Sequence, residues 1–220
     1  MVNAPTANAS SYFEDEDVTT PAKHGTTVQS GWEAAQALFA PKKTGTNYAP
    51  DFKVTEQPQL VRFLEDIPFA SYRQHWINRS EGKRSFVCLG AECPLCTIAG
   101  DRPTARAAFN VVVLTDEEPV TKVLTASAPL YRLITAANED PRRGPLSKYF
   151  WAIARQGVGL NTTYSLDRVK AVDLAEEWNL EIEDVEDILS SATQYDSTAV
   201  YTSPREELLT LAQQLVNGNS

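Results

Sequence analysis

Seven short runs with the composition of β-strands occupy the middle of the chain. β-Branched and aromatic residues are frequent in these runs, and turn-forming residues separate them, which is the pattern of β-strands. The predicted strands are Leu60–Leu64, Phe69–Ile77, Ser85–Val87, Ala107–Leu114, Val120–Leu124, Tyr149–Ala154 and Thr162–Leu166.

Five other segments show the spacing of amphipathic helices. In one of them Leu130, Leu133, Ile134 and Ala137 form a single apolar face. In the segment that starts at residue 30, Ser30 and Glu33 form a capping-box pattern at the helix start. The predicted helices are 30–39, Pro129–Ala137, Val172–Trp178, Ile182–Leu189 and Pro204–Val216.

Seven short strands with one inserted helix predict a mainly β chain with peripheral helices, of the α+β class. A small, partly open barrel of the OB type fits this pattern, although periodicity alone does not separate it from another small β-barrel. The domain organisation predicted from the sequence is a disordered N-terminal arm (1–27), a short helix and linker (28–50), an OB-like domain (51–170) and an acidic helical C-terminal region (171–220).

The composition is that of a globular protein of 220 residues, 42% of them hydrophobic. No apolar run approaches the roughly 20 residues that a membrane span requires, so no membrane association is expected. The first sixteen residues have neither the basic start nor the apolar stretch of a signal peptide. We therefore expect a cytoplasmic location, where thiols stay reduced.

The charge is segregated along the chain. The formal net charge is −9, which argues against a nucleic-acid binder when taken alone. However, residues 52–170 carry 16 Lys/Arg against 12 Asp/Glu, while residues 171–220 carry one basic residue against 11 acidic ones. A mildly basic middle followed by an acidic end indicates two surfaces with different partners, although the acidic end also fits a role in solubility alone.

The clearest chemical signal is three cysteines within nine positions. Cys93 and Cys96 form a CxxC, which allows two thiolates to hold one metal ion from a tight turn, and Cys88 precedes them at the end of a predicted strand. A redox role for the CxxC is disfavoured because the βαβ context of thioredoxin-like sites is absent. Structural zinc takes four ligands, so a fourth is needed.

The chain has two histidines that can supply the fourth ligand. His24 lies in the predicted arm, whereas His75 lies on the strand that precedes Cys88, and a hairpin between the two strands brings them together. An ordinary polar histidine of the barrel is the alternative for His75. The prediction is an inserted zinc-binding loop, within about residues 70–110, that holds one structural zinc ion. Its ligands are His75, Cys88, Cys93 and Cys96.

Aromatic and cationic residues interleave around this loop and again near residue 150. Single-stranded DNA is bound by such a combination, because cations follow the phosphates while bases stack on ring faces. Tyr72, and either Tyr149 or Trp151, are the predicted stacking residues, whereas Trp76 is interpreted as packing beneath the metal and Phe109 as core. The predicted DNA-binding residues are Tyr72, Arg73, Arg79, Lys83, Arg84, Arg102, Arg106, Arg142, Arg143, Lys148, Tyr149, Trp151 and Arg155.

The span from Phe69-Ala-Ser-Tyr-Arg-Gln-His-Trp through Cys93-Pro-Leu-Cys96 to Phe109-Asn-Val-Val resembles single-stranded DNA-binding proteins of tailed phages of actinobacteria. The metal-ligand spacing is also similar to that of T-even phage helix-destabilising proteins. This resemblance implies an OB-fold core, a zinc subdomain beside the DNA cleft, and an acidic C-terminal region that recruits phage or host replication and recombination proteins. One departure is the acidic arm, Glu14-Asp15-Glu16-Asp17, where the T-even proteins have a basic arm that drives cooperative binding, so self-association along DNA stays open.

The leading hypothesis is a sequence-independent protein that coats and protects single-stranded DNA during replication, recombination and repair of phage DNA, in the cytoplasm of the bacterial host. The alternative is a zinc-containing regulator or adaptor that acts on duplex DNA, RNA or a protein. That alternative needs a recognition helix with Arg, Asn or Gln, and the predicted helices are acidic or apolar. The sequence shows no phosphate-binding glycine loop and no HExxH pair, so an enzyme is not expected.

Overall fold

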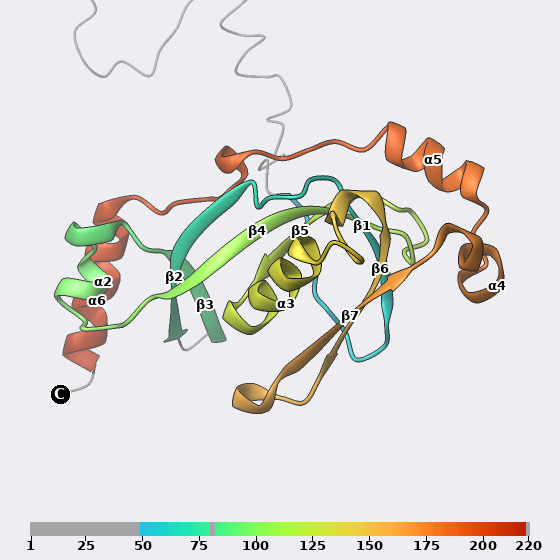
Figure 1. Ribbon diagram of the computed structural model, residues 1–220. Coiled ribbons are helices and arrows are strands. Elements are labelled where there is room, and N and C mark those ends of the chain that lie inside the picture. Colours follow the sequence, from blue (N-terminus) through green and yellow to red (C-terminus); the bar gives the residue numbers. More distant parts are fainter. Residues whose placement is uncertain (1–48, 80–81, 219–220) are drawn as a thin grey trace, which may run out of the picture. The chain divides into compact units, whose positions relative to one another are not determined.

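The computed structural model (Figure 1) describes residues 49–79 and 82–218. The predicted arm (1–27) and the predicted helix at 30–39 lie outside these residues. The strands are β1 (Gln59–Phe63), β2 (Ala70–Arg79), β3 (Gly82–Val87), β4 (Thr104–Val113), β5 (Thr121–Ala126), β6 (Phe150–Gln156) and β7 (Thr163–Val169). The α-helices are α2 (Pro94–Thr97), α3 (Ala128–Glu139), α4 (Leu174–Trp178), α5 (Ile182–Ser190) and α6 (Arg205–Gly218).

All seven predicted strands are present, and they form one antiparallel sheet in the order β3-β2-β4-β1-β6-β7, with β5 paired to β4. Strand β4 organises the sheet because it has partners on both sides. Along one edge it pairs with β5, and along the other it pairs first with β2 and then with β1. The α+β class is therefore confirmed.

The predicted OB-type barrel is wrong in one respect, because the sheet is not closed. Among the described residues β7 pairs only with β6, and the outer edge of β5 is bonded by the segment before β1. In that segment the Phe52 amide donates to the Val123 carbonyl at 2.9 Å, and the Thr55 carbonyl accepts from the Arg155 amide at 2.7 Å. Alternation of polar and apolar residues reports which face of a strand is buried, not which strand lies beside it, so closure was not predictable.

Two apolar clusters lie on opposite faces of the sheet. Phe109, Val111 and Val113 of β4 belong to one cluster, and Val112 belongs to the other, as the alternation of a strand requires. Helix α3 packs into the first cluster through residues that the sequence predicted as its apolar face, including Leu130. Helices α4 and α5 cover the second cluster. Because both faces are covered, residues Ala107–Leu114 are all buried.

The three helices of the C-terminal region agree closely with those predicted. Helices α4 and α5 pack on the sheet, and α6 packs instead beside α2 in a third apolar cluster (Figure 1). Between α5 and α6 the backbone of Tyr195 is fixed to β4 by the buried side chain of Asn110, which accepts from the Tyr195 amide at 3.0 Å and donates to its carbonyl at 2.9 Å. No helix in the described residues is long and apolar enough to cross a bilayer.

Candidate metal centre and nucleic-acid surface

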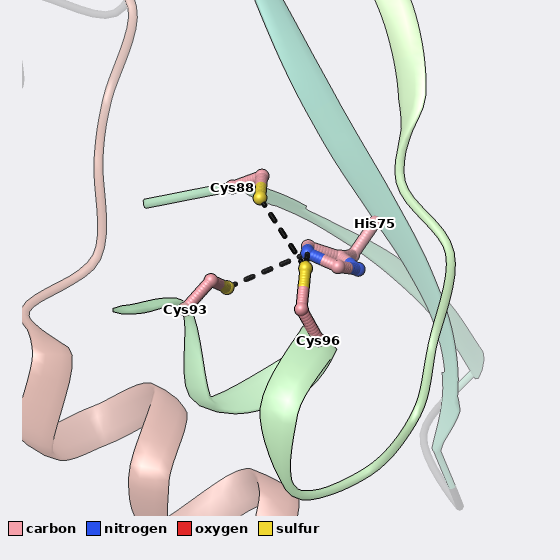
Figure 2. Close-up of side chains that lie close together, drawn as sticks. All are labelled: His75, Cys88, Cys93 and Cys96. Carbon is pink, nitrogen blue, oxygen red and sulfur yellow. Dashed lines mark hydrogen bonds between the residues drawn. The ribbon is translucent and has the colours of Figure 1, made fainter. Parts of the chain in front are cut away.

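Four side chains from separate parts of the chain converge on one point (Figure 2). His75 comes from β2, Cys88 from the residue after β3, and Cys93 and Cys96 from the turn that forms α2. Their ligand atoms all lie within 4.8 Å of one another. This cluster can hold a metal ion such as zinc, and its four residues are those predicted from the sequence.

The local sequence explains why the cysteines converge. The β2–β3 ladder continues one step past β3, where the Cys88 amide donates to the Arg73 carbonyl at 2.8 Å. Gly90 then adopts a φ of +83°, a conformation that favours glycine and that turns the chain back toward the hairpin. Pro94 starts α2, and the amide of Cys96 donates to the Cys93 carbonyl at 3.0 Å, which places both thiols on the same side of the turn.

The interatomic distances fit tetrahedral coordination. Zn–S bonds of about 2.3 Å and Zn–N bonds of about 2.0–2.1 Å place two sulfurs about 3.8 Å apart and a sulfur and a nitrogen about 3.6 Å apart. The Sγ atoms of Cys88 and Cys96 are 3.6 Å apart, and His75 Nε2 lies 3.5 Å from Cys93 Sγ and 3.6 Å from Cys96 Sγ. The donor set, three thiols and one imidazole, is one that structural zinc sites use.

The crowding of three thiols opposes the ionisation that metal binding requires. Burial and the neighbouring sulfurs of Cys88 and Cys93 raise the pKa of Cys96 to about 12. At Cys93 burial also opposes ionisation, but hydrogen bonds from the backbone of Leu89, Cys96 and Leu95 outweigh it and lower the pKa to about 7. Three adjacent thiolates need a cation to offset their mutual repulsion, and a divalent metal supplies it.

A carboxylate contact orients the ring of His75. Asp101 Oδ2 lies 2.6 Å from His75 Nδ1, the ring nitrogen that faces away from the sulfurs. A proton on Nδ1 donated to this carboxylate leaves Nε2 free to bind a metal, the arrangement found around many zinc-bound histidines. Sequence reasoning missed Asp101, because no local pattern indicates which carboxylate faces a histidine 26 residues away.

Replacing Asp101 by asparagine is expected to weaken zinc binding by about 10- to 100-fold without abolishing it, because partners that orient a ligand contribute about that much. The affinity can be measured by competition with a chromophoric chelator. The matched control is Asp116→Asn, which removes a carboxylate that pairs with Lys122 on β5. An unchanged zinc affinity in the Asp101 variant would show that the carboxylate does not orient the ring.

The metal cluster is buried on the side where α6 packs. His75 and Cys93 are fully buried, and Cys88 and Cys96 are half-buried. Cys93 shares an apolar cluster with Ile77, Phe86 and Leu95 from the hairpin and α2, and with residues of α6.

The β2–β3 hairpin carries most of the exposed cations near this centre. Strand alternation places Arg73, Arg79 and Arg84 on the face that also bears His75, and Lys83 on the opposite face. All four side chains are exposed. Two other predicted residues, Tyr72 and Arg106, are half-buried and lie opposite each other on β2 and β4. Arg102 is exposed in the segment between α2 and β4.

A second group of predicted residues lies around Tyr149. This residue directly precedes β6, at the end of that strand opposite the β6–β7 turn. The Lys148 ammonium and the Arg168 guanidinium lie 5.5 Å and 4.7 Å from the centre of this half-buried ring. Arg168, which sequence reasoning did not select, also donates to the carbonyl of Arg142, whose own side chain is exposed. The last predicted cation, Arg155, is half-buried near the β6–β7 turn.

Two tryptophan assignments are wrong. Trp151 is fully buried, and its indole N–H donates to the Leu146 carbonyl at 2.9 Å, so its ring is part of the core and not a stacking surface. Arg143, predicted to bind DNA, lies 5.8 Å from that ring and donates to the Leu166 carbonyl, which gives it a structural contact. Conversely, Trp76 does not pack beneath the metal, because 43% of its surface is exposed on the other face of β2. Phe109 is core, as predicted.

Comparison of the sequence with models of known protein families found no match, and comparison with curated proteins found none.

Proposed function

We propose that this chain is a sequence-independent single-stranded DNA-binding protein, which coats and protects unpaired strands during replication, recombination and repair of phage DNA. The observation that carries the proposal is the β2–β3 hairpin, which presents Arg73, Arg79 and Arg84 on one face. On its other face Lys83 lies beside the exposed indole of Trp76. Cations that follow phosphates and rings that stack bases are the two elements of such binding. The action proposed is stoichiometric, with no chemical step.

The metal centre supports this role by fixing the hairpin. We propose that the ion is a single structural zinc, because His75 lies within β2 and Cys88 directly follows β3, so that one ion ties both strands to α2. A two-stranded ribbon at the edge of a sheet is only marginally stable by itself. A metal bond at its base holds the cations in place before DNA arrives, so less ordering entropy is lost on binding.

The acidic C-terminal region supports a second part of the proposal, namely contact with replication and recombination proteins of the phage or host. The carboxylates of Glu176, Glu177, Glu183, Asp184 and Glu186 are all exposed on α4 and α5. The apolar residues of the same helices face the sheet, so the acidic face is held outward. Such a surface attracts basic partners and repels DNA phosphates, which keeps the two kinds of ligand apart.

Binding of oligo-dT is expected to weaken steeply as salt rises, because each phosphate contact to a single strand adds about 0.7 to the slope of log K against log salt. Arg79→Ala and Lys83→Ala should each weaken binding at low salt and reduce that slope by about 0.7. Lys122→Ala is the matched control, since it removes a cation that is already paired with Asp116. Fluorescence anisotropy of a labelled oligonucleotide measures all four proteins.

Competition with duplex DNA of the same length separates this proposal from the alternative, a zinc-containing regulator or adaptor that acts on duplex DNA, RNA or protein. Preference for the single strand supports coating of unpaired DNA. Equal or stronger binding to the duplex, or affinity that does not respond to salt, would contradict the proposal.

A further inference from the structure

A polar groove runs beside the β2–β3 hairpin, on the opposite face of β2 from the metal centre. It consists of two hollows of about 300 and 400 Å³ that share Asp51, Gln74, Ser85 and Thr125. The larger hollow also reaches a cluster of aromatic and cationic side chains. We call the larger hollow the Trp76 groove, and it is lined by these four residues together with Phe52, Lys53, Val54, Trp76, Leu124, Leu130, Arg155 and Tyr164.

Trp76 is the most unusual residue of this groove. Its ring is 43% exposed and belongs to none of the three apolar clusters, so it is not needed to fill the core. Strand alternation forces this position, because the neighbouring His75 is buried on the metal side. An exposed indole that lies beside a groove and cations offers a ring face on which a base can stack.

Two cations flank the ring without covering it completely. The Lys83 ammonium lies 5.8 Å and the Arg106 guanidinium 6.0 Å from the ring centre. Arg106 is held there by its Nε–H, which donates to the Gln74 side-chain oxygen at 3.1 Å. A partly exposed indole with two cations over its ring suits a ligand that combines a flat π-system with a nearby anion.

The opposite wall supplies further positive charge and an unsatisfied donor. Arg155 Nε is buried, and no hydrogen-bond acceptor reaches it among the described residues. The guanidinium of Arg155 also lines the groove, where its charge would attract an anionic ligand. Asp51 is the only acid among the residues that line the groove, and Lys53, two residues along, offsets its charge.

We propose that the Trp76 groove is a nucleotide subsite, in which one unpaired base stacks on Trp76 and an adjoining phosphate lies near Arg155 and Lys53. This inference rests on the proposed binding of single strands and identifies where one nucleotide lies. The volume, about 400 Å³, is within the range of about 300–1,000 Å³ that is usual for small ligands. Ser85 and Thr125 offer hydroxyls that any base can use, so the subsite is expected to tolerate all four.

Trp76→Leu is expected to weaken binding of oligo-dT by about 5- to 150-fold at low salt, which corresponds to the loss of one stacked base. Trp76→Phe should lose less, because a phenyl ring still stacks. In the wild type, binding should quench tryptophan emission, and Trp76→Phe should lose most of that quenching. Trp178→Phe is the matched control and should keep both affinity and quenching. Trp178 is the last residue of α4, and its side chain packs against the second apolar cluster.

Photocrosslinking of the wild-type protein to oligo-dT that carries 5-iododeoxyuridine provides a readout that needs no variant. Crosslinked peptides should contain Trp76 or its neighbours on β2. If the wild type binds oligo-dT but Trp76→Leu binds equally well, or crosslinks are confined to the region of Tyr149, the subsite is wrong while the proposed function stands. If the wild type does not bind oligo-dT in dilute buffer, the proposed function itself fails, and the subsite with it.

Discussion

Replacing Cys93 by serine is expected to abolish tight zinc binding and to unfold the metal module, the part of the chain formed by β2, β3 and α2. Cys93 is the most buried of the three cysteines, with its side chain fully enclosed. Zinc bound to small structural sites contributes apparent free energies on the order of 10 kcal/mol to folding, so its loss exceeds what the module gains from its small apolar cluster. A serine hydroxyl does not replace the thiolate ligand.

The consequence can be measured in three ways on the same sample. Zinc content should fall from one ion per chain to none, the thermal midpoint should drop, and limited proteolysis should cut between β2 and β4. Thr97→Ala is the matched control, because its hydroxyl donates to the Cys93 carbonyl at 3.1 Å but does not reach the metal. It should keep the zinc. A metal-free Cys93→Ser protein with an unchanged thermal midpoint would show that the centre does not stabilise the fold.

Replacing Leu208 by alanine is expected to destabilise the protein by about 2–5 kcal/mol and to weaken zinc binding at the same time. Leu208 lies on α6, is fully buried, and shares an apolar cluster with Cys93 and Leu95. Because this helix covers the metal module, any loosening of its contacts raises the population of states in which the ligands are apart. The C-terminal helix is therefore expected to stabilise the metal centre.

Chemical denaturation measures the loss of stability, and competition with a chelator measures the zinc affinity. Gln213→Ala on the same helix is the matched control, since that side chain is exposed, and both quantities should stay near wild type. If Leu208→Ala lowers stability but leaves zinc affinity unchanged, α6 and the metal centre fold independently. That outcome would contradict the coupling proposed between them.

The strands were predictable because they are rich in β-branched and aromatic residues and are separated by turn residues. Strand β4 shows the limit of this reasoning. Its residues from Ala107 to Val113 are apolar except Asn110, which indicates burial on both faces but leaves the partners on each edge open. Pairing with β5, β2 and β1 depends on contacts between residues distant in sequence. For the same reason the failure of the sheet to close was not foreseeable.

The assignment of aromatic side chains to the core or to the surface required the fold, although part of it was within reach of the sequence. Once His75 was taken as a buried ligand, strand alternation already placed Trp76 on the other face. For Trp151 no neighbouring residue of known burial fixed the orientation of the strand. Both faces of β6 are covered, and the neighbouring Phe150 is also buried. The prediction of stacking by Trp151 failed there, whereas Tyr149 and Tyr72 remain predictions.

By itself, the sequence determined the four residues of the candidate metal cluster, the seven strands and the helices of the C-terminal region, because each depends on short-range patterns along the chain. Only the tertiary structure decided that Asp101 contacts the His75 ring, that α6 packs against the metal module, and that Trp76 lines a groove. These features join residues that are separated by tens of positions. Local periodicity carries no information about such pairs, since it reflects how each segment is buried and not what buries it.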